Sequence, residues 1–148
     1  MKPTNVLITG FSLLSLTTQE LKWIYKVGGP TADYGNGFAT DSDQSVYDIT
    51  NFMGTVNVGI SLSYISRSGE DILIRKSSTL GLLQWDRQLG GARSDIGYDI
   101  TTDLEDNIFV VGTFQDSLYF GNEVILSGTG NVIFSFIIKL NSEGQILW

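Results

Sequence analysis

The sequence predicts an all-β protein built from two similar antiparallel sheets, and three observations lead to this prediction. The 148 residues contain one internal repeat with a spacing of about 62 residues. Within each copy, short runs of β-branched and aromatic residues alternate with Gly, Asn, Asp and Ser, which is the pattern of hairpins. After residue 20, no segment keeps apolar residues at helical spacing over three turns, so few helices are expected.

The repeat is defined by a W-x4-G-G motif followed by Asp-x-Gly. Its positions in the two copies are Trp23, Gly28, Gly29, Asp33, Gly35, Trp85, Gly90, Gly91, Asp95 and Gly97. Further along, Lys76-x4-Gly81-x3-Trp85 recurs as Lys139-x4-Gly144-x3-Trp148, now 63 residues apart. One residue is therefore inserted in the second copy, and the two units cover about residues 23–84 and 85–147.

Each unit is expected to contain four strands. In the first unit the predicted strands are 37–41, 46–52, 71–76 and 82–89. In the second unit they are 97–103, 108–114 and 132–140, with a short run at 118–120 and another strand starting at 146. A sheet of this kind cannot bury both faces alone and stacks on its neighbour. The predicted fold is therefore a partial β-propeller of two four-stranded antiparallel blades placed side by side.

Residues 20–148 resemble the SBBP β-propeller repeat of secreted and surface bacterial proteins. The second copy carries the resemblance best, at Gly90, Gly91, Asp95, Gly97, Asp103, Asn107, Gly112, Phe136, Lys139, Leu140 and Gly144. The first copy departs from the pattern: Thr50 stands where the second has Gly112, and Gln44-Ser45 replaces a Gly-Asn turn. The resemblance implies a scaffold for binding or display and brings no catalytic motif with it.

Composition excludes several classes of function. The chain has no Cys and no His, which rules out disulfides, Cys/His zinc sites, cysteine nucleophiles and His-based general bases. Its net charge is −7, which argues against nucleic acid and anionic membrane surfaces as partners. Membrane insertion is not expected either, because the apolar run at 6–16 is shorter than the roughly 20 residues of a spanning helix.

The first nineteen residues have the pattern of a secretory signal peptide. Lys2 precedes the apolar run at 6–16, and polar residues 17–19 follow. We therefore expect residues 1–19 to be a signal peptide and the protein to be secreted, periplasmic or on the cell surface. The alternative is that this run is a strand, or the tail of a preceding unit.

Four constellations were considered as sites. The Gly-Gly pairs lack the strand and helix around a phosphate loop and are expected to be turn glycines. Asp103, Glu105 and Asp106 are candidate Ca²⁺ ligands, although Asp in tight turns usually bonds its own backbone. Asp33 and Asp95 are either loop-fixing acceptors or members of a catalytic pair, and their equivalence favours the first. The repeated tryptophans indicate a packing position between blades rather than a sugar platform.

Trp148 ends the sequence before the Gly-Gly pair that should follow it, and propellers usually close with 4–8 blades. The chain is therefore expected to be a fragment of a longer propeller, a unit that self-associates into a ring, or an open stack with exposed edges. The first is favoured. We expect a non-catalytic binding or structural module with a protein or glycan ligand and no cofactor. The alternative is part of a propeller hydrolase or lyase whose catalytic residues lie in other blades.

Overall fold

The computed structural model describes residues 22–59 and 62–148, and this part of the chain consists of strands, turns and loops. Its strands are β1 (Val27–Gly28), β2 (Asp33–Thr40), β3 (Val46–Val58), β4 (Leu62–Ser77), β5 (Leu83–Gly90), β6 (Ile96–Thr102), β7 (Ile108–Gln115), β8 (Ser117–Phe120), β9 (Glu123–Ser127) and β10 (Ile133–Leu140). In these residues no helix is long and apolar enough to cross a membrane. The predicted signal peptide at 1–19 lies outside the described residues.

The larger sheet has seven strands and is centred on the long β3–β4 hairpin. β2, β3, β4 and β5 follow one another as antiparallel neighbours, and this order matches the predicted four strands of the first unit. β3 changes partner along its length: it pairs with β2 at 46–52 and with β1 at 57–58. At the other edge, β5 pairs with β8, and β8 pairs with β9.

The smaller sheet has three antiparallel strands in the order β10-β7-β6. Beyond β10, Ile146 forms an isolated bridge with Leu140, and Lys139 exchanges backbone hydrogen bonds with Leu147 and Trp148. The all-β class and the antiparallel pairing are confirmed, but the predicted strand count per sheet is wrong. The larger sheet gains β1, which pairs with β3, and the hairpin β8–β9, which pairs with β5. The smaller sheet has three strands because the strand predicted to start at 146 forms an isolated bridge.

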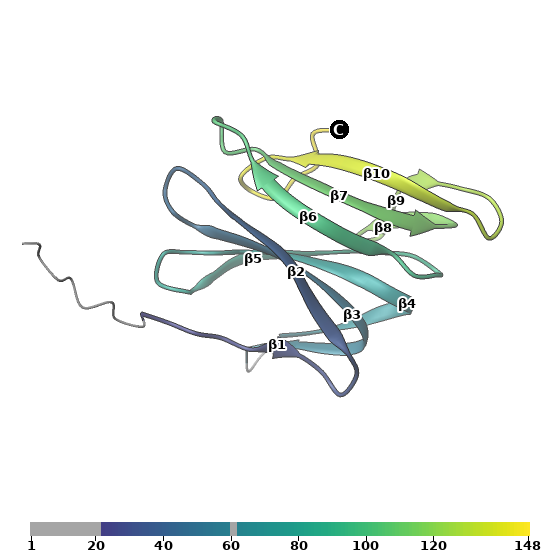
Figure 1. Cartoon of the computed structure of the whole chain (residues 1–148), viewed down its shortest axis with the longest axis horizontal. Coiled ribbons are helices and arrows are strands. Elements are labelled where there is room, and N and C mark those ends of the chain that lie inside the picture. The colour runs from purple at the N-terminus through teal and green to yellow at the C-terminus, as the bar shows by residue number, and fades with distance from the viewer. Residues whose placement is uncertain (1–21, 60–61) are drawn as a thin grey trace, which may run out of the picture.

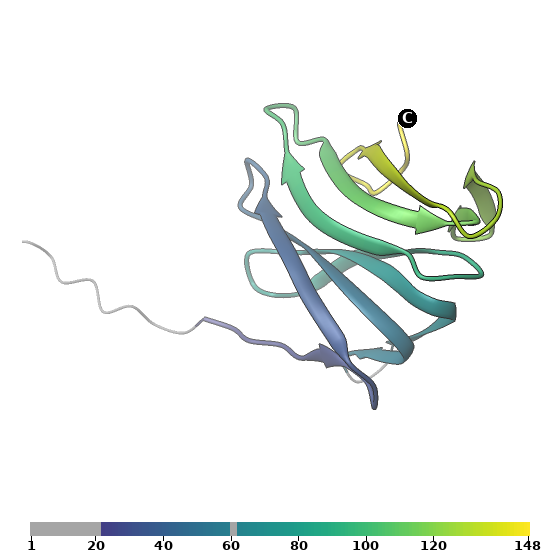
Figure 2. The ribbon, with the colours of Figure 1, turned by 45° about the vertical axis from the view of Figure 1, so that its right-hand side comes forward.

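The two sheets stack face to face, and the main core lies between them (Figure 1). β2 and β6, the first strand of each unit, run beside one another at one side of the stack (Figure 2). Alternation along each strand sends apolar side chains into the space between the sheets. The buried members of this core are Tyr47, Ile49, Ile72, Ile74, Leu89, Ile100, Ile108, Val110, Phe114, Leu118, Phe136, Ile138 and Leu140. A smaller cluster of Phe52, Val56, Val58 and Leu73 lies on the opposite face of the first sheet.

At two pairs of equivalent positions the backbone conformation is the same in both units although the residues differ. Gln44 and Asp106 both adopt left-handed conformations, with φ of 62° and 61°. Gly54 and Asp116, also one repeat apart, have φ of 70° and 69°. Left-handed φ is unfavourable for residues with a side chain. Gln44, Asp106 and Asp116 therefore adopt it because the hairpins around them impose that conformation.

Candidate binding surface

The two W-x4-G-G tryptophans lie in equivalent places. The indole nitrogen of Trp23 donates a hydrogen bond to the carbonyl of Thr79 at 3.0 Å, and that of Trp85 donates to Ser142 at 2.9 Å. Each ring covers a turn glycine, Gly81 or Gly144, where an added Cβ would press on the indole. Each tryptophan therefore packs the start of its unit onto a turn near the end of the same unit. Trp148 is 63% exposed, and its ring meets that of Phe109 edge-on at 6.1 Å.

The two Asp-x-Gly carboxylates hold the Gly-Gly turns. Asp33 Oδ2 accepts the N–H of Gly29 at 2.7 Å, and Asp95 Oδ2 accepts the N–H of Gly91 at 2.6 Å. A Cβ on Gly29 would overlap the carbonyl of Thr55, and one on Gly91 would overlap that of Ser117. Glycine is required at these two positions because backbone approaches backbone there.

The remaining glycines of the repeat differ in their surroundings. Gly90 lies against the carboxylate of Asp71, and Gly97 against the side chain of Ile49. Gly28 has a left-handed φ of 155°, whereas Gly35 has open space where a Cβ would point.

An ion pair recurs in the two units. Lys76 Nζ lies 3.0 Å from Asp41 Oδ2, and Lys139 Nζ lies 3.1 Å from Asp103 Oδ2. Each aspartate also closes its own turn, because Oδ1 accepts the N–H four residues later, from Ser45 or Asn107, at 2.8 Å. Burial opposes ionisation of Asp41, but the Lys76 ammonium and the Ser45 N–H outweigh it and lower the pKa of that carboxyl.

A groove separates the two turns at this end of the stack. Its volume is about 470 Å³, and it is lined by Thr40, Asp41, Ser42, Thr102, Asp103, Leu104 and Asp106. Asp106 bridges the units across it: its carboxylate accepts the N–H of Ser42 at 2.8 Å and the hydroxyl of Ser42 at 2.6 Å. Leu104 is fully exposed beside these groups. Hydroxyls, carboxylates and one projecting apolar side chain therefore surround a concave surface, which we call the turn groove.

Of the candidate Ca²⁺ ligands, Asp103 and Asp106 line the turn groove, whereas Glu105 is not among its lining residues. Asp103 is engaged by Lys139, by Asn107 and by the N–H of Glu105 at 3.0 Å. Asp106 is engaged by Ser42. Within residues 22–59 and 62–148 no group of three or more Asp and Glu side chains is arranged to hold a metal ion.

Asp71 and Asp95 form a second acidic site, which lies inside the protein. Both side chains are fully buried. Burial, together with a smaller effect of the Asp71 carboxylate, raises the pKa of Asp95 to about 7 against the opposing effect of the Gly91 and Gln115 N–H groups. Burial also raises the pKa of Asp71, although Gln88 donates to it at 2.6 Å.

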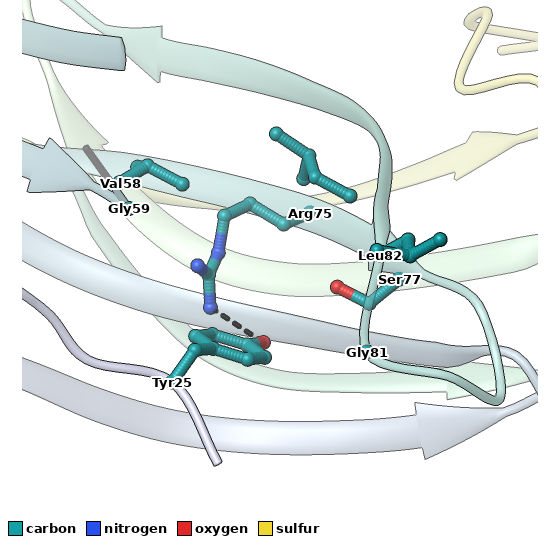
Figure 3. A pocket seen from close by; sticks show the side chains of 8 residues that line it. Tyr25, Val58, Gly59, Arg75, Ser77, Gly81 and Leu82 are labelled. Atoms are coloured by element: carbon teal, nitrogen blue, oxygen red, sulfur yellow. Dashed lines mark hydrogen bonds between the residues drawn. The ribbon is translucent and has the colours of Figure 1, made fainter. Parts of the chain in front are cut away.

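One constellation escaped the sequence analysis. Tyr25, Asp48 and Arg75 meet on the face of the first sheet that points away from the second. Figure 3 shows the hydrogen bond between Arg75 and Tyr25. The hydroxyl of Tyr25 donates to Asp48 at 2.6 Å and accepts from Arg75 at 2.8 Å, and Arg75 also pairs directly with Asp48. A hollow of about 210 Å³ adjoins them, bounded by Val58 and by the turn at 81–83.

Comparing the two units would have revealed this cluster. Asp48 stands where the second unit has Val110, and Arg75 stands where it has Ile138. Both positions are apolar in the second unit and charged in the first. Such a paired change indicates that this face of the sheet has different surroundings in the two units.

Comparison with known proteins supports the repeat. Residues 84–113 match the SBBP β-propeller repeat. The matched segment runs through β5 and β6 into β7. An uncharacterised WD repeat-containing protein of Acanthamoeba polyphaga mimivirus is 24% identical over 160 residues, covering 89% of this chain. The chain spans 12% of the length of that relative. WD repeats are also propeller blades, so both comparisons confirm the predicted resemblance to propeller repeats.

Proposed function

We propose that the chain is a partial β-propeller of two blades that acts as a non-catalytic binding or structural module. The first blade comprises β2–β5, and the second comprises β6, β7 and β10 with an outer strand that begins at Ile146. The recurrence of the Trp, Gly-Gly-Asp and Asp–Lys contacts in both units carries this proposal. In both copies these polar side chains fix turns of the scaffold, and this is a structural role.

The burial and the contacts of four aspartates support a non-catalytic role. Acid and base catalysis needs carboxyls that reach a substrate, at different protonation states. Asp71 and Asp95 have raised pKa values but are fully buried. Asp41 and Asp103 face the turn groove but are held by lysines and backbone N–H groups. A hydrolase or lyase built on this scaffold would need its acid and base from other residues.

The turn groove is the proposed ligand surface, and a glycan or a protein is the proposed ligand class. Its hydroxyls and carboxylates offer hydrogen bonds, and Leu104 offers an apolar contact. The N-terminal pattern and the SBBP resemblance support a place on an exported or cell-surface protein, where such ligands are met.

Titration of the ¹⁵N-labelled chain with soluble oligosaccharides of several linkage types, followed by NMR, tests the proposal. We expect saturable shifts confined to residues 40–42 and 102–106, reduced by Leu104→Ala and kept by Asp43→Asn, an exposed acid outside the groove. The same samples are assayed for new reducing ends. Oligosaccharide cleavage that is lost in Asp95→Asn would overturn the non-catalytic role.

A further inference from the structure

The hollow of about 210 Å³ beside Tyr25 and Arg75 has no part in the function proposed above. It lies on the face of the first sheet that also carries the smaller apolar cluster, and Val58 belongs to both. Leu82 and Leu83, from the turn between β4 and β5, add to its wall. Apolar side chains therefore form much of this wall, as they do in most small-molecule sites.

Two buried polar side chains also line this hollow. Arg75 is 3% exposed and Ser77 is 2% exposed. Arg75 donates through Nε and Nη2 to Asp48 and Tyr25, whereas its Nη1 group forms no hydrogen bond with any residue of 22–59 or 62–148. Figure 3 shows the Ser77 hydroxyl directed toward the side of the hollow where Arg75 and Tyr25 lie. Polar groups of buried side chains nearly always have a partner, so Nη1 is a donor that a bound molecule can use.

The second unit has apolar residues at both of these polar positions. Ile138 stands at the position of Arg75, and Leu140 stands at the position of Ser77. Both are buried in the main core. Because serine is much shorter than leucine, the exchange at position 77 leaves room in the first unit and places a hydroxyl at the wall. The strand itself accepts a large apolar side chain at this position, since the second unit has one there.

The charges beside the hollow favour an uncharged molecule. The positive charge of Arg75 is paired with the negative charge of Asp48, so the two sum to zero. An anion would therefore lose its hydration without meeting a net positive charge. A cation would meet the guanidinium with a like charge and would offer no acceptor to Nη1. The molecule that fits is neutral and brings an oxygen acceptor.

The volume of the hollow sets the size of the apolar part. An apolar cavity of about 150 Å³ takes up benzene, so 210 Å³ admits a six-membered ring with a small substituent. We propose that this hollow binds a neutral small molecule made of one apolar ring and a carbonyl oxygen. The ring packs among Val58, Leu82 and Leu83, and the oxygen accepts hydrogen bonds from Arg75 Nη1 and the Ser77 hydroxyl. This is a second site, and it does not depend on the turn groove.

Cyclohexanone, which has the ring and the neutral carbonyl, is the probe. It is titrated into the ¹⁵N-labelled full chain and followed by NMR, beside protonated cyclohexylamine and cyclohexanecarboxylate, which keep the ring and change the charge. We expect saturable shifts of the amides of residues 77 and 81–83 with the ketone, and binding of both ions weaker by about tenfold or more. Residues 40–42 and 102–106 of the turn groove should not shift. No shift with the ketone, or an ion that binds as tightly as the ketone, would overturn the proposal.

Two substitutions locate the bound ketone. Ser77→Leu supplies the residue that the second unit has at this position, so it should fill the hollow and abolish the shifts, and near-UV circular dichroism checks its folding. Leu82→Ala covers a failure of that variant to fold and should weaken binding by about tenfold. Its matched control is Leu80→Ala, on the same turn, which is 73% exposed and is not a lining residue. Unchanged binding in folded Ser77→Leu, or equal losses in the two leucine variants, would place the ketone elsewhere and overturn the proposal.

Discussion

Asn51 on β3 holds Gly97 on β6 with both ends of its side-chain amide. Its Oδ1 accepts the N–H of Gly97 at 2.9 Å, and its Nδ2 donates to the Gly97 carbonyl at 3.2 Å. Asn51 is only 3% exposed. We predict that Asn51→Ala lowers the free energy of unfolding by about 1–3 kcal/mol, because it leaves the buried Gly97 N–H without a partner and the Gly97 carbonyl with Asn36 as its remaining side-chain donor. Urea denaturation measures this change.

Asn36→Ala is the matched control for that substitution. Asn36 also donates to the Gly97 carbonyl, but it is exposed, so water can replace it. Its removal should lower the free energy of unfolding by less than about 1 kcal/mol. Equal losses for the two variants would contradict the role given to burial.

Gly91 allows no side chain. A Cβ there would overlap the carbonyl oxygen of Ser117, which is part of the backbone and cannot rotate away. We predict that Gly91→Ala lowers the free energy of unfolding by about 2–3 kcal/mol through this overlap. Gly35→Ala, where a Cβ meets nothing within 4 Å, should instead be neutral or slightly stabilising. Thermal unfolding of the two variants decides, and a stable Gly91→Ala protein would show that the turn can move.

Asp95 gives the protein a pH dependence of unusual sign. Its pKa is raised to about 7 in the folded chain, so the folded state keeps a proton that the unfolded state loses near pH 4. The free energy of unfolding should therefore fall as the pH rises from about 4 to about 7, by a few kcal/mol. In Asp95→Asn this contribution is absent. The difference between the wild-type and variant unfolding free energies, measured across that range, should change with pH, and parallel curves would exclude a raised pKa.

The two Asp–Lys ion pairs differ in burial and should differ in importance. The side chains of Lys76 and Asp41 are 13% and 3% exposed, whereas those of Lys139 and Asp103 are 20% and 23% exposed. We predict that Lys76→Met lowers the free energy of unfolding by about 2–4 kcal/mol, because it leaves a buried carboxylate without its cation. Lys139→Met should cause a smaller loss, since water reaches Asp103. Chemical denaturation at neutral pH compares them, and the reverse order would contradict the argument.

The local features of the fold could be predicted from the sequence. Repeated Trp, Gly and Asp residues at a fixed spacing indicated two similar units, and alternation of apolar residues placed strands such as 108–114 close to where they lie. These predictions succeed because turn chemistry and side-chain alternation act over a few residues.

The long-range features could not be predicted in the same way. The strand at 118–120 was expected, but its pairing with β5 of the larger sheet depends on how the sheets meet. The contacts of Asn51 with Gly97 and of Asp106 with Ser42 also join residues that are distant in the chain. Asp48 and Arg75 were not recognised because a search for a repeat looks for identical residues in the two units. These two positions form a cluster in the first unit because their residues differ from those in the second.

The pairing of β5 with β8 makes the sequence repeat and the hydrogen-bonded sheet end at different places. Leu89 pairs with Phe120, so backbone hydrogen bonds join the hairpin β8–β9 to the sheet that contains β2, β3 and β4. Separating the two halves of the chain would break the backbone hydrogen bonds of one continuous sheet. The protein should melt as one cooperative body, and severing the chain between its halves should leave two pieces that hold together only when refolded in each other's presence.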